Sequence, residues 1–160
     1  MWEQKKDTKV YDLNEAKLKI EHFCAYQERS HKQVQEKLRL FGLRPDVADE
    51  LVIELIQGNF LNETRFASAF TRGRFNIKGW GKIKIKQHLK MHKVSEYNIK
   101  SALKEISDSD YFDKFEKLAT KKWAALKGEN AIQKKQKLIR FMYSRGFESQ
   151  MAYEFIRDKK

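Results

Sequence analysis

Lysine and arginine are concentrated in one part of this 160-residue sequence. The chain has 34 Lys and Arg against 22 Asp and Glu, which gives a net charge of +12 and a pI near 9.7. Residues 72–104 hold ten of the cations and a single acid, Glu96, and therefore carry +9 of the net charge. Positive charge at this density is typical of a surface that binds phosphates, because neutralised phosphates release counterions. The segment predicts a polyanionic partner such as single- or double-stranded DNA.

The candidate contact residues surround a tryptophan that stands between two glycines. Trp80 could reach a base, a sugar or a partner's loop, or it could cover a small core, and the sequence leaves both open. The alternation of lysines at 82, 84 and 86 predicts a broad basic surface around a helix, and not a helix that reads bases. Lysines near a helix start oppose the positive end of the helix dipole, which suggests a partner that supplies negative charge. A merely solvated face is the alternative. The candidate binding residues are Arg72, Arg74, Lys78, Trp80, Lys82, Lys84, Lys86 and Lys90.

No group of residues predicts an enzyme. Cys24 lies two residues from His22 on the apolar face of a predicted helix, which is more typical of a buried side chain than of a nucleophile. His88 and His92 are four residues apart, but no third metal ligand accompanies them. The acids between 108 and 116 surround a helix start, where they favour the helix dipole. Without a P-loop, any nucleotide dependence would belong to a partner. We expect no catalytic residue, no metal and no cofactor.

Cysteine content and hydropathy indicate the compartment. A single cysteine excludes an intramolecular disulfide, and the first residues, MWEQKKDTKVYD, lack the apolar segment of a signal peptide. No apolar run approaches the roughly 20 residues that a membrane span needs. We expect a soluble, cytoplasmic monomer that binds no membrane.

Nearly every segment predicts helix, since apolar residues recur at spacings of three and four and Pro45 is the only proline. Asn14 is the expected N-cap of the first helix, and Ser30 with Gln33 forms a capping-box signature for the second. Gly42 is expected to end that second helix, and Pro45 suits the first turn of a third. No strand is expected.

The apolar pattern repeats with a period near 52 residues. Val34 and Leu38 correspond to Ile85 and Leu89, and then to Leu138 and Met142, while Gly42 corresponds to Gly146. Lys93 replaces the glycine in the middle copy. A helical protein can match itself by chance, but the coincident glycines favour true repeats. We expect a flexible segment 1–13 followed by three-helix repeats at 14–58, 59–107 (basic) and 108–160, whose first helices begin near Asn14, Asn62 and Asp110.

The stretch 60–89 resembles the central signature of the RecX family, small regulators of the RecA recombinase. The matching residues are Phe60-Leu61-Asn62-Glu63, Arg65-Phe66-Ala67, Phe70, Arg72, Arg74, Lys78-Gly79-Trp80-Gly81 and the basic helix to Leu89. Arg29-Ser30, Ile99 with Ala102 and Leu103, and Ser144-Arg145-Gly146-Phe147 also fit the family pattern. The resemblance covers about residues 14–157. The sequence departs from the family at Asn62-Glu63, where an acidic pair is commoner, and at Lys93.

This resemblance implies an all-α fold of three tandem three-helix repeats in a curved, elongated array that lodges in the groove of the RecA nucleoprotein filament. It also implies a regulator, with inhibition as the expected sign, that modulates strand exchange, ATP hydrolysis and coprotease activity in DNA repair and the SOS response. The alternative is a helical DNA-binding protein, architectural or transcription-regulating, that acts without RecA, because three-helix units also form helix-turn-helix domains. Three similar units in series, with cations concentrated in the middle one, favour the first function.

Overall fold

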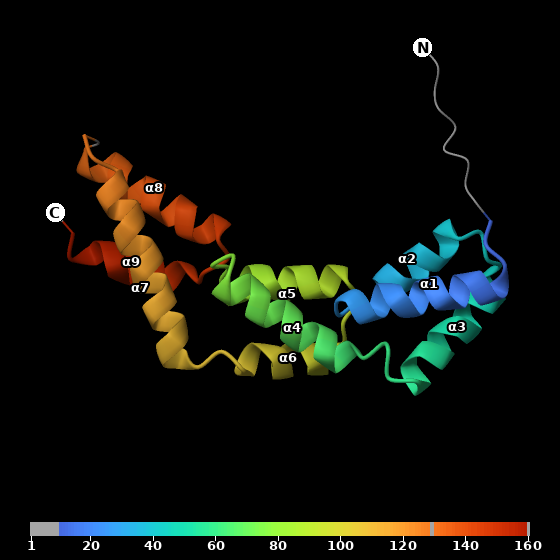
Figure 1. Ribbon diagram of the computed structural model, residues 1–160. Coiled ribbons are helices and arrows are strands. Elements are labelled where there is room, and N and C mark those ends of the chain that lie inside the picture. Colours follow the sequence, from blue (N-terminus) through green and yellow to red (C-terminus); the bar gives the residue numbers. More distant parts are fainter. Residues whose placement is uncertain (1–9, 129, 160) are drawn as a thin grey trace, which may run out of the picture. The chain divides into compact units, whose positions relative to one another are not determined.

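The computed structural model describes residues 10–128 and 130–159, and these residues form nine helices and no strand (Figure 1). The expected all-α fold is therefore confirmed. In chain order the helices are α1 (Leu13–Tyr26), α2 (His31–Leu40), α3 (Pro45–Gln57), α4 (Glu63–Asn76), α5 (Lys82–Met91), α6 (Glu96–Lys104), α7 (Asp108–Ala125), α8 (Ala131–Ser144) and α9 (Ser149–Arg157). Residues 1–9 of the expected N-terminal segment lie outside the described part.

The chain divides into two compact units. The first unit extends to Phe66 and adds His92–Val94, and the second holds Ala67–Met91 and the chain from Ser95 onward. In the first unit α2 packs against both α1 and α3. Its core gathers around Val34 and Leu38, which are fully buried. The second unit contains most of α4 and the helices α5 to α9, so it holds nearly all the basic segment.

The expected N-cap of α1, Asn14, was wrong by two residues, while α7 begins at Asp108, near the expected Asp110. Helix α1 begins before Asn14, because the Asp12 carboxylate accepts a hydrogen bond from the Glu15 N–H at 2.9 Å. Helix α7 begins before Asp110, whose N–H donates to the Ser107 hydroxyl at 3.1 Å. In both places a residue with an equally good capping side chain stands just upstream of the expected one.

The other helix signals are confirmed. Ser30 and Gln33 form the capping box of α2, and Pro45 is the first residue of α3. The Asn62 side chain accepts a hydrogen bond from the Arg65 N–H at 2.9 Å and so caps α4.

Equivalent positions of the three predicted repeats have equivalent environments. Val34, Ile85 and Leu138 are fully buried, and so are Leu38, Leu89 and Met142. The turn after the second helix of each repeat uses a left-handed residue: Gly42 at φ 77°, Lys93 at φ 58° and Gly146 at φ 90°. The middle turn therefore keeps its conformation although it carries a lysine, which costs free energy that glycine avoids. The repeat limits and the curved, elongated shape remain predictions.

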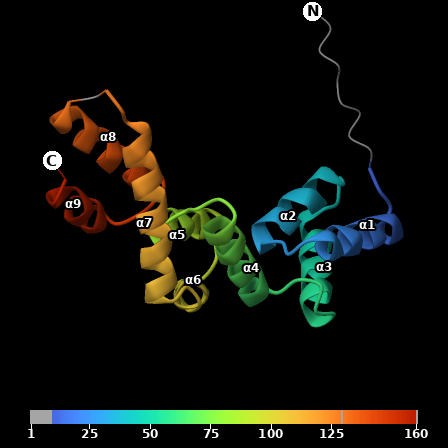
Figure 2. The ribbon, with the colours of Figure 1, turned by 60° about the vertical axis from the view of Figure 1, so that its left-hand side comes forward.

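In the second unit, α5 packs against α6, and α8 packs against both α7 and α9 (Figure 2). Phe115 and Phe147, almost fully buried, meet edge to face at 5.5 Å between ring centroids. Tyr111 lies between Phe147 and Phe75 of α4, with ring centroids 5.2 and 6.1 Å away. Aromatic contacts of this kind join the middle repeat to the third.

Candidate nucleic-acid interface

The first turn of α5 meets the turn that follows α8. The Gly81 N–H donates to the Arg145 carbonyl at 2.7 Å, and the Ile83 N–H donates to the Gly146 carbonyl at 3.0 Å. A helix start has N–H groups without partners and a helix end has carbonyls without partners. Here each end satisfies the other, so the junction fixes α5 against the third repeat.

A side-chain relay completes this junction. The Lys82 N–H donates to the Tyr111 hydroxyl at 3.0 Å, and that hydroxyl donates to the Glu148 carboxylate at 2.6 Å. Burial, and next the hydrogen bond to Glu148, raise the pKa of Tyr111 well above its ordinary value, so the phenol stays protonated. The negative charge that the start of α5 favours is therefore supplied from inside the fold. That a partner also supplies negative charge to the lysines near this helix start stays a prediction.

Gly81 permits the close approach of the two segments. A Cβ at position 81 would overlap the Gly146 carbonyl and stand 2.5 Å from the Phe147 nitrogen. A Cβ on Gly146 would in turn overlap the Lys84 side chain. The two glycines thus let backbone touch backbone between the repeats.

One face of α5 carries a cluster of rings and cations around Trp80. The half-buried indole lies 4.5 Å from the His88 ring and meets Phe70 edge to face at 6.4 Å. The Lys84 ammonium lies 4.5 Å from the indole centroid and the Arg74 guanidinium 5.1 Å from it. Trp80 is therefore neither a buried core residue nor a free platform, because its partners are already within the fold.

The opposite face of α5 borders a hollow of about 450 Å³ against α6. Five lysines line it: Lys82, Lys86 and Lys90 from α5, and Lys100 and Lys104 from α6. Glu96 is the one acid in the lining, and Ile99 and Leu103 supply apolar surface. Among the described residues, none of the five lysines forms an ion pair with a carboxylate. Residues 82 and 86 therefore share a face that residue 84 does not, so the three lysines lie around the helix and not along one stripe.

The remaining candidate residues lie at the edges of these two faces. Arg72 is exposed and forms an ion pair with Glu105 at 3.7 Å while donating to the Ser68 hydroxyl at 3.0 Å. Lys78 is exposed, and its carbonyl accepts a hydrogen bond from the Arg145 guanidinium at 2.9 Å.

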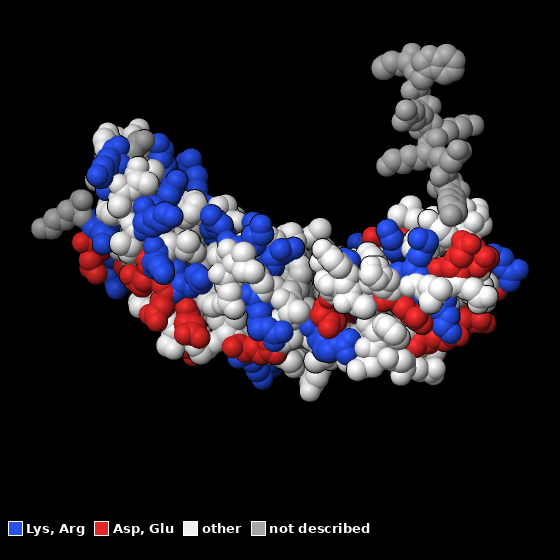
Figure 3. Space-filling view, viewed as in Figure 1, with Lys and Arg blue, Asp and Glu red and all other residues white. Residues whose placement is uncertain are grey.

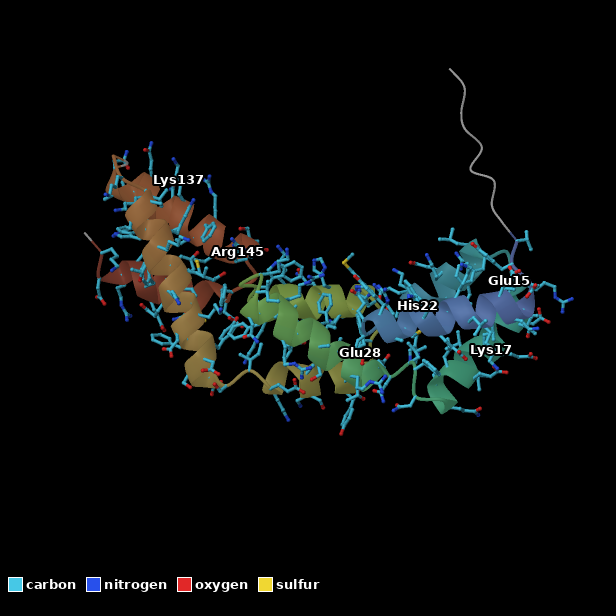
Figure 4. The ribbon with its side chains drawn as sticks, in the orientation of Figure 1. Glu15, Lys17, His22, Glu28, Lys137 and Arg145 are labelled. Atoms are coloured by element: carbon cyan, nitrogen blue, oxygen red, sulfur yellow. The ribbon has the colours of Figure 1, made fainter. Side chains whose placement is uncertain are left out.

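Basic and aromatic residues continue onto α7 and α8, where the sequence analysis placed no contact. The Lys134 ammonium lies 4.1 Å from the Trp123 ring centroid, and Lys122 lies 4.8 Å from that of Phe141. Figure 3 shows lysine and arginine side chains gathered over α5, α7 and α8 of the second unit. Lys137 and Arg145, labelled in Figure 4, belong to α8 and the turn that follows it.

The lysine-lined hollow between α5 and α6 did have a signal in the sequence. Lysines 86 and 90, and lysines 100 and 104, are each four residues apart and so lie on one face of a helix.

The other titratable candidates have local partners. Cys24 is buried, and this burial raises the pKa of its thiol to about 11. The charge of Arg29 opposes the rise and that of Glu28 adds to it. Burial lowers the pKa of His88, and the charges of Lys84 and Arg74 lower it further. The Nδ1 atom of His92 lies 3.1 Å from the Ser30 hydroxyl. Across residues 10–128 and 130–159, no three His, Cys, Asp and Glu side chains gather in a way that could hold a metal ion. No described helix has the length and apolar character needed to cross a membrane.

Comparisons with known proteins agree with one another. Residues 62–103 match a family model described as RecX, second three-helix domain, and residues 108–156 match RecX, third three-helix domain. The chain is similar to the regulatory protein RecX of Clostridium perfringens, at 30% identity over 131 residues, 81% of this chain and 61% of the relative. It is also similar to that of Leuconostoc mesenteroides, at 26% identity over 131 residues, 82% of this chain and 49% of the relative. The chain thus spans about half the length of these relatives.

Two crystal structures have the same fold. One, of a regulatory protein RecX, matches with a TM-score of 0.81 over 92% of this chain and 72% of its own. The other, of RecX from Lactobacillus salivarius, matches with a TM-score of 0.79 over 92% of this chain and 96% of its own. Both are 22% identical to this chain, so the likeness concerns the fold alone.

Proposed function

The chain belongs to the RecX family of regulatory proteins, and we propose that it regulates a RecA-type recombinase by binding the RecA–DNA filament. Inhibition is the expected sign. In this role the chain modulates strand exchange, ATP hydrolysis and coprotease activity in DNA repair and the SOS response. It acts in the cytoplasm as a monomer and without a catalytic site of its own.

The observation that carries this proposal is the lysine-lined hollow between α5 and α6. Its five ammonium groups have no carboxylate partner among the described residues, and of the five only Lys82 lies over a ring, 4.8 Å from the Tyr111 centroid, whereas Arg74 and Lys84 both lie over Trp80. Cations that the fold leaves unpaired gain the most from phosphates, because each contact releases counterions. Lys86 and Lys90 are therefore the strongest of the proposed DNA contacts, and Lys82, which also lies over the Tyr111 ring, follows them.

The other proposed contacts differ in what they can offer. Lys78 is exposed and can approach a phosphate directly. Arg74, Trp80 and Lys84 form a preassembled cluster whose exposed part offers a ring and charges together, which suits a sugar or an unstacked base. Arg72 must first leave Glu105, so we expect the weakest contribution from it.

The alternative function, a helix-turn-helix protein that acts without RecA, fits less well with the junction between the start of α5 and the turn after α8. Recognition helices place their N-terminal residues in the major groove. The first turn of α5 is bonded to Arg145, Gly146 and Tyr111, so the third repeat occupies the space that DNA would need. The most basic helix of the chain is therefore poorly placed to read bases.

RecA ATP hydrolysis on single-stranded DNA tests the proposal. The chain is added at concentrations too low to coat the DNA, and the hydrolysis rate is followed as its concentration rises. A change in the rate under these conditions supports an action on the filament. If the rate changes only when the DNA is saturated, the chain competes for DNA and the alternative function holds. The same titration on a longer DNA, at a constant RecA concentration, distinguishes an action on the filament from competition for DNA.

A further inference from the structure

The hollow between α5 and α6 is built from two helices that aim their lysines at one space. Lys82, Lys86 and Lys90 stand four residues apart on α5, and Lys100 and Lys104 stand four apart on α6. Residues at this spacing lie on one face of a helix. Both helices therefore present a row of ammonium groups to the same hollow of about 450 Å³.

The charge of this hollow is not balanced within the described fold. Glu96 is the one acid in its lining, and it forms no ion pair with any of the five lysines. Like charges on neighbouring turns repel each other and destabilise a helix. An anion in the hollow would remove that repulsion from both rows at once, so the arrangement favours a ligand with several negative charges.

The floor of the hollow restricts the kind of anion. Only 2% of the surface of Ile99 is exposed, and Leu103 lines the hollow with it. A volume of this size is in the range of small-molecule sites, and so is larger than a single phosphate requires. An apolar floor with a cationic rim suits adjacent phosphates carried on an organic frame, in which the frame covers the floor and the phosphates meet the rim.

We propose that this hollow is a binding site for two or three adjacent phosphate groups, formed by Lys82, Lys86, Lys90, Lys100 and Lys104. The phosphates can belong to a nucleic-acid strand or to a free nucleotide, and the chemistry of recognition is the same. Such binding needs no RecA, so the site can be occupied whether or not the proposed function holds.

Calorimetry on the full chain with inorganic tripolyphosphate and with ATP tests the site. The double variant Lys86→Gln and Lys100→Gln removes one exposed lysine from each row, and we expect it to bind tripolyphosphate about tenfold more weakly. Lys121→Gln with Lys127→Gln is the control, because it removes the same charge from exposed positions outside the hollow. The control should change the affinity less than about twofold. Equal losses in the two double variants, or no binding by the parent chain, would overturn the site.

A variant with the opposite effect sharpens the test. Glu96→Gln removes the acid from the lining, so we expect it to tighten tripolyphosphate binding about threefold. Glu96 is exposed in the first turn of α6, so the substitution leaves the core intact. An unchanged or weaker affinity in Glu96→Gln would count against the hollow as the site.

Competition identifies the source of the phosphates. If an oligothymidylate displaces tripolyphosphate and Lys86→Gln with Lys100→Gln weakens both ligands, the site holds a nucleic-acid strand. If the strand binds both proteins equally while ATP and tripolyphosphate compete, the site holds a free nucleotide. Either result supports a phosphate site. An oligoglutamate of matching charge that binds as tightly as tripolyphosphate would instead show a general acid-binding surface and overturn the proposal.

Discussion

Lysines project from two faces of α5, and the two faces differ in what surrounds the charge. On one face Lys84 lies against the Trp80 indole, and its ammonium donates to the Ser144 carbonyl at 3.4 Å. On the other face Lys86 and Lys90 border a hollow with two more lysines across it and no carboxylate bonded to any of them. The cations of the first face have partners within the fold, and those four lysines of the second have no carboxylate partner among the described residues.

This difference separates two meanings of a basic sequence. Cations that lie on aromatic rings stabilise the protein that carries them, because the ring quadrupole replaces part of their hydration. Cations that converge without partners destabilise it slightly and gain from a polyanion. A charge count treats the two alike, although only the second kind indicates a binding site.

Undocking α5 should break the comparison, because the junction with the turn after α8 fixes the helix that carries both faces. Gly81→Ala places a methyl group against the Gly146 carbonyl, which forces the two repeats apart. We expect the free energy of unfolding of the second unit to fall by about 3 kcal/mol, as for an overpacked core. Urea denaturation followed by circular dichroism and by tryptophan fluorescence measures it.

Gly73→Ala is the matched control for that substitution. Gly73 lies within α4, and a Cβ there would meet no atom within 4 Å. Alanine should therefore stabilise the helix by about 0.5–1 kcal/mol. If Gly81→Ala lowers the free energy of unfolding by no more than Gly73→Ala raises it, the junction does not hold the repeats together.

Neutralising each face in turn sharpens the comparison. Lys86→Gln with Lys90→Gln should reduce the salt dependence of single-stranded DNA binding by about 1.4 logarithmic units, at about 0.7 per phosphate contact. Arg74→Gln with Lys84→Gln removes the same charge from the face of α5 that carries Trp80, here called the ring face. This variant should change the salt dependence of binding by less than half as much, while lowering the stability of the fold. Affinities measured at several salt concentrations, with circular dichroism as the folding control, give both quantities.

The reverse ranking would be informative as well. If the ring-face variant loses more of the slope than the hollow-face variant, the cations on Trp80 meet the DNA. The lysines of the hollow would then be merely solvated.

The sequence predicted the fold better than the site, for a physical reason. Burial repeats with the period of the chain, so Val34, Ile85 and Leu138 could be aligned from their apolar character alone. The alignment with Gly42 and Gly146 left two possibilities at Lys93, a different turn or a lysine at positive φ, and the structure has the second. The N-cap of α1 was missed because two nearby residues, Asp12 and Asn14, could cap the helix, and only the backbone path decides which one does.

The site was predicted as one stretch, but it is formed by contacts between distant residues. Nothing in the stretch 72–90 indicates that Arg145 and Gly146 cover the start of α5, since more than 50 residues separate the two segments. Lys100 and Lys104 join the hollow because α6 folds back on α5. Local composition locates the charge, but tertiary packing decides which part of it stays unpaired.

Lys93 provides a cation near α5 that belongs to neither face. It adopts φ 58°, where a lysine is strained. In Lys93→Gly the relief of strain exceeds the entropy that glycine adds to the unfolded chain, so we expect a stabilisation of about 0.5 kcal/mol. Affinity for tripolyphosphate should stay the same although the net charge falls by one. A marked loss of affinity would show that total charge, and not the arrangement of the two faces, controls anion binding.

The smallest expected effect is a difference in acid sensitivity between the two faces. The ring face carries His88, whose pKa is lowered from its ordinary 6.5, first by burial against Trp80 and then by the charges of Lys84 and Arg74. The unfolded chain therefore binds the proton more readily than the folded one, and the contribution of His88 to stability is lost as the pH falls through 6.5 toward the lower folded pKa. An NMR titration of the His88 ring should give a midpoint below 6.5, raised in Lys84→Gln because one of the two repelling charges is gone. Lys86→Gln, on the opposite face, should leave the midpoint in place. Equal upward shifts in the two variants would mean that His88 senses the overall charge of α5, and the two faces would then not be electrostatically separate.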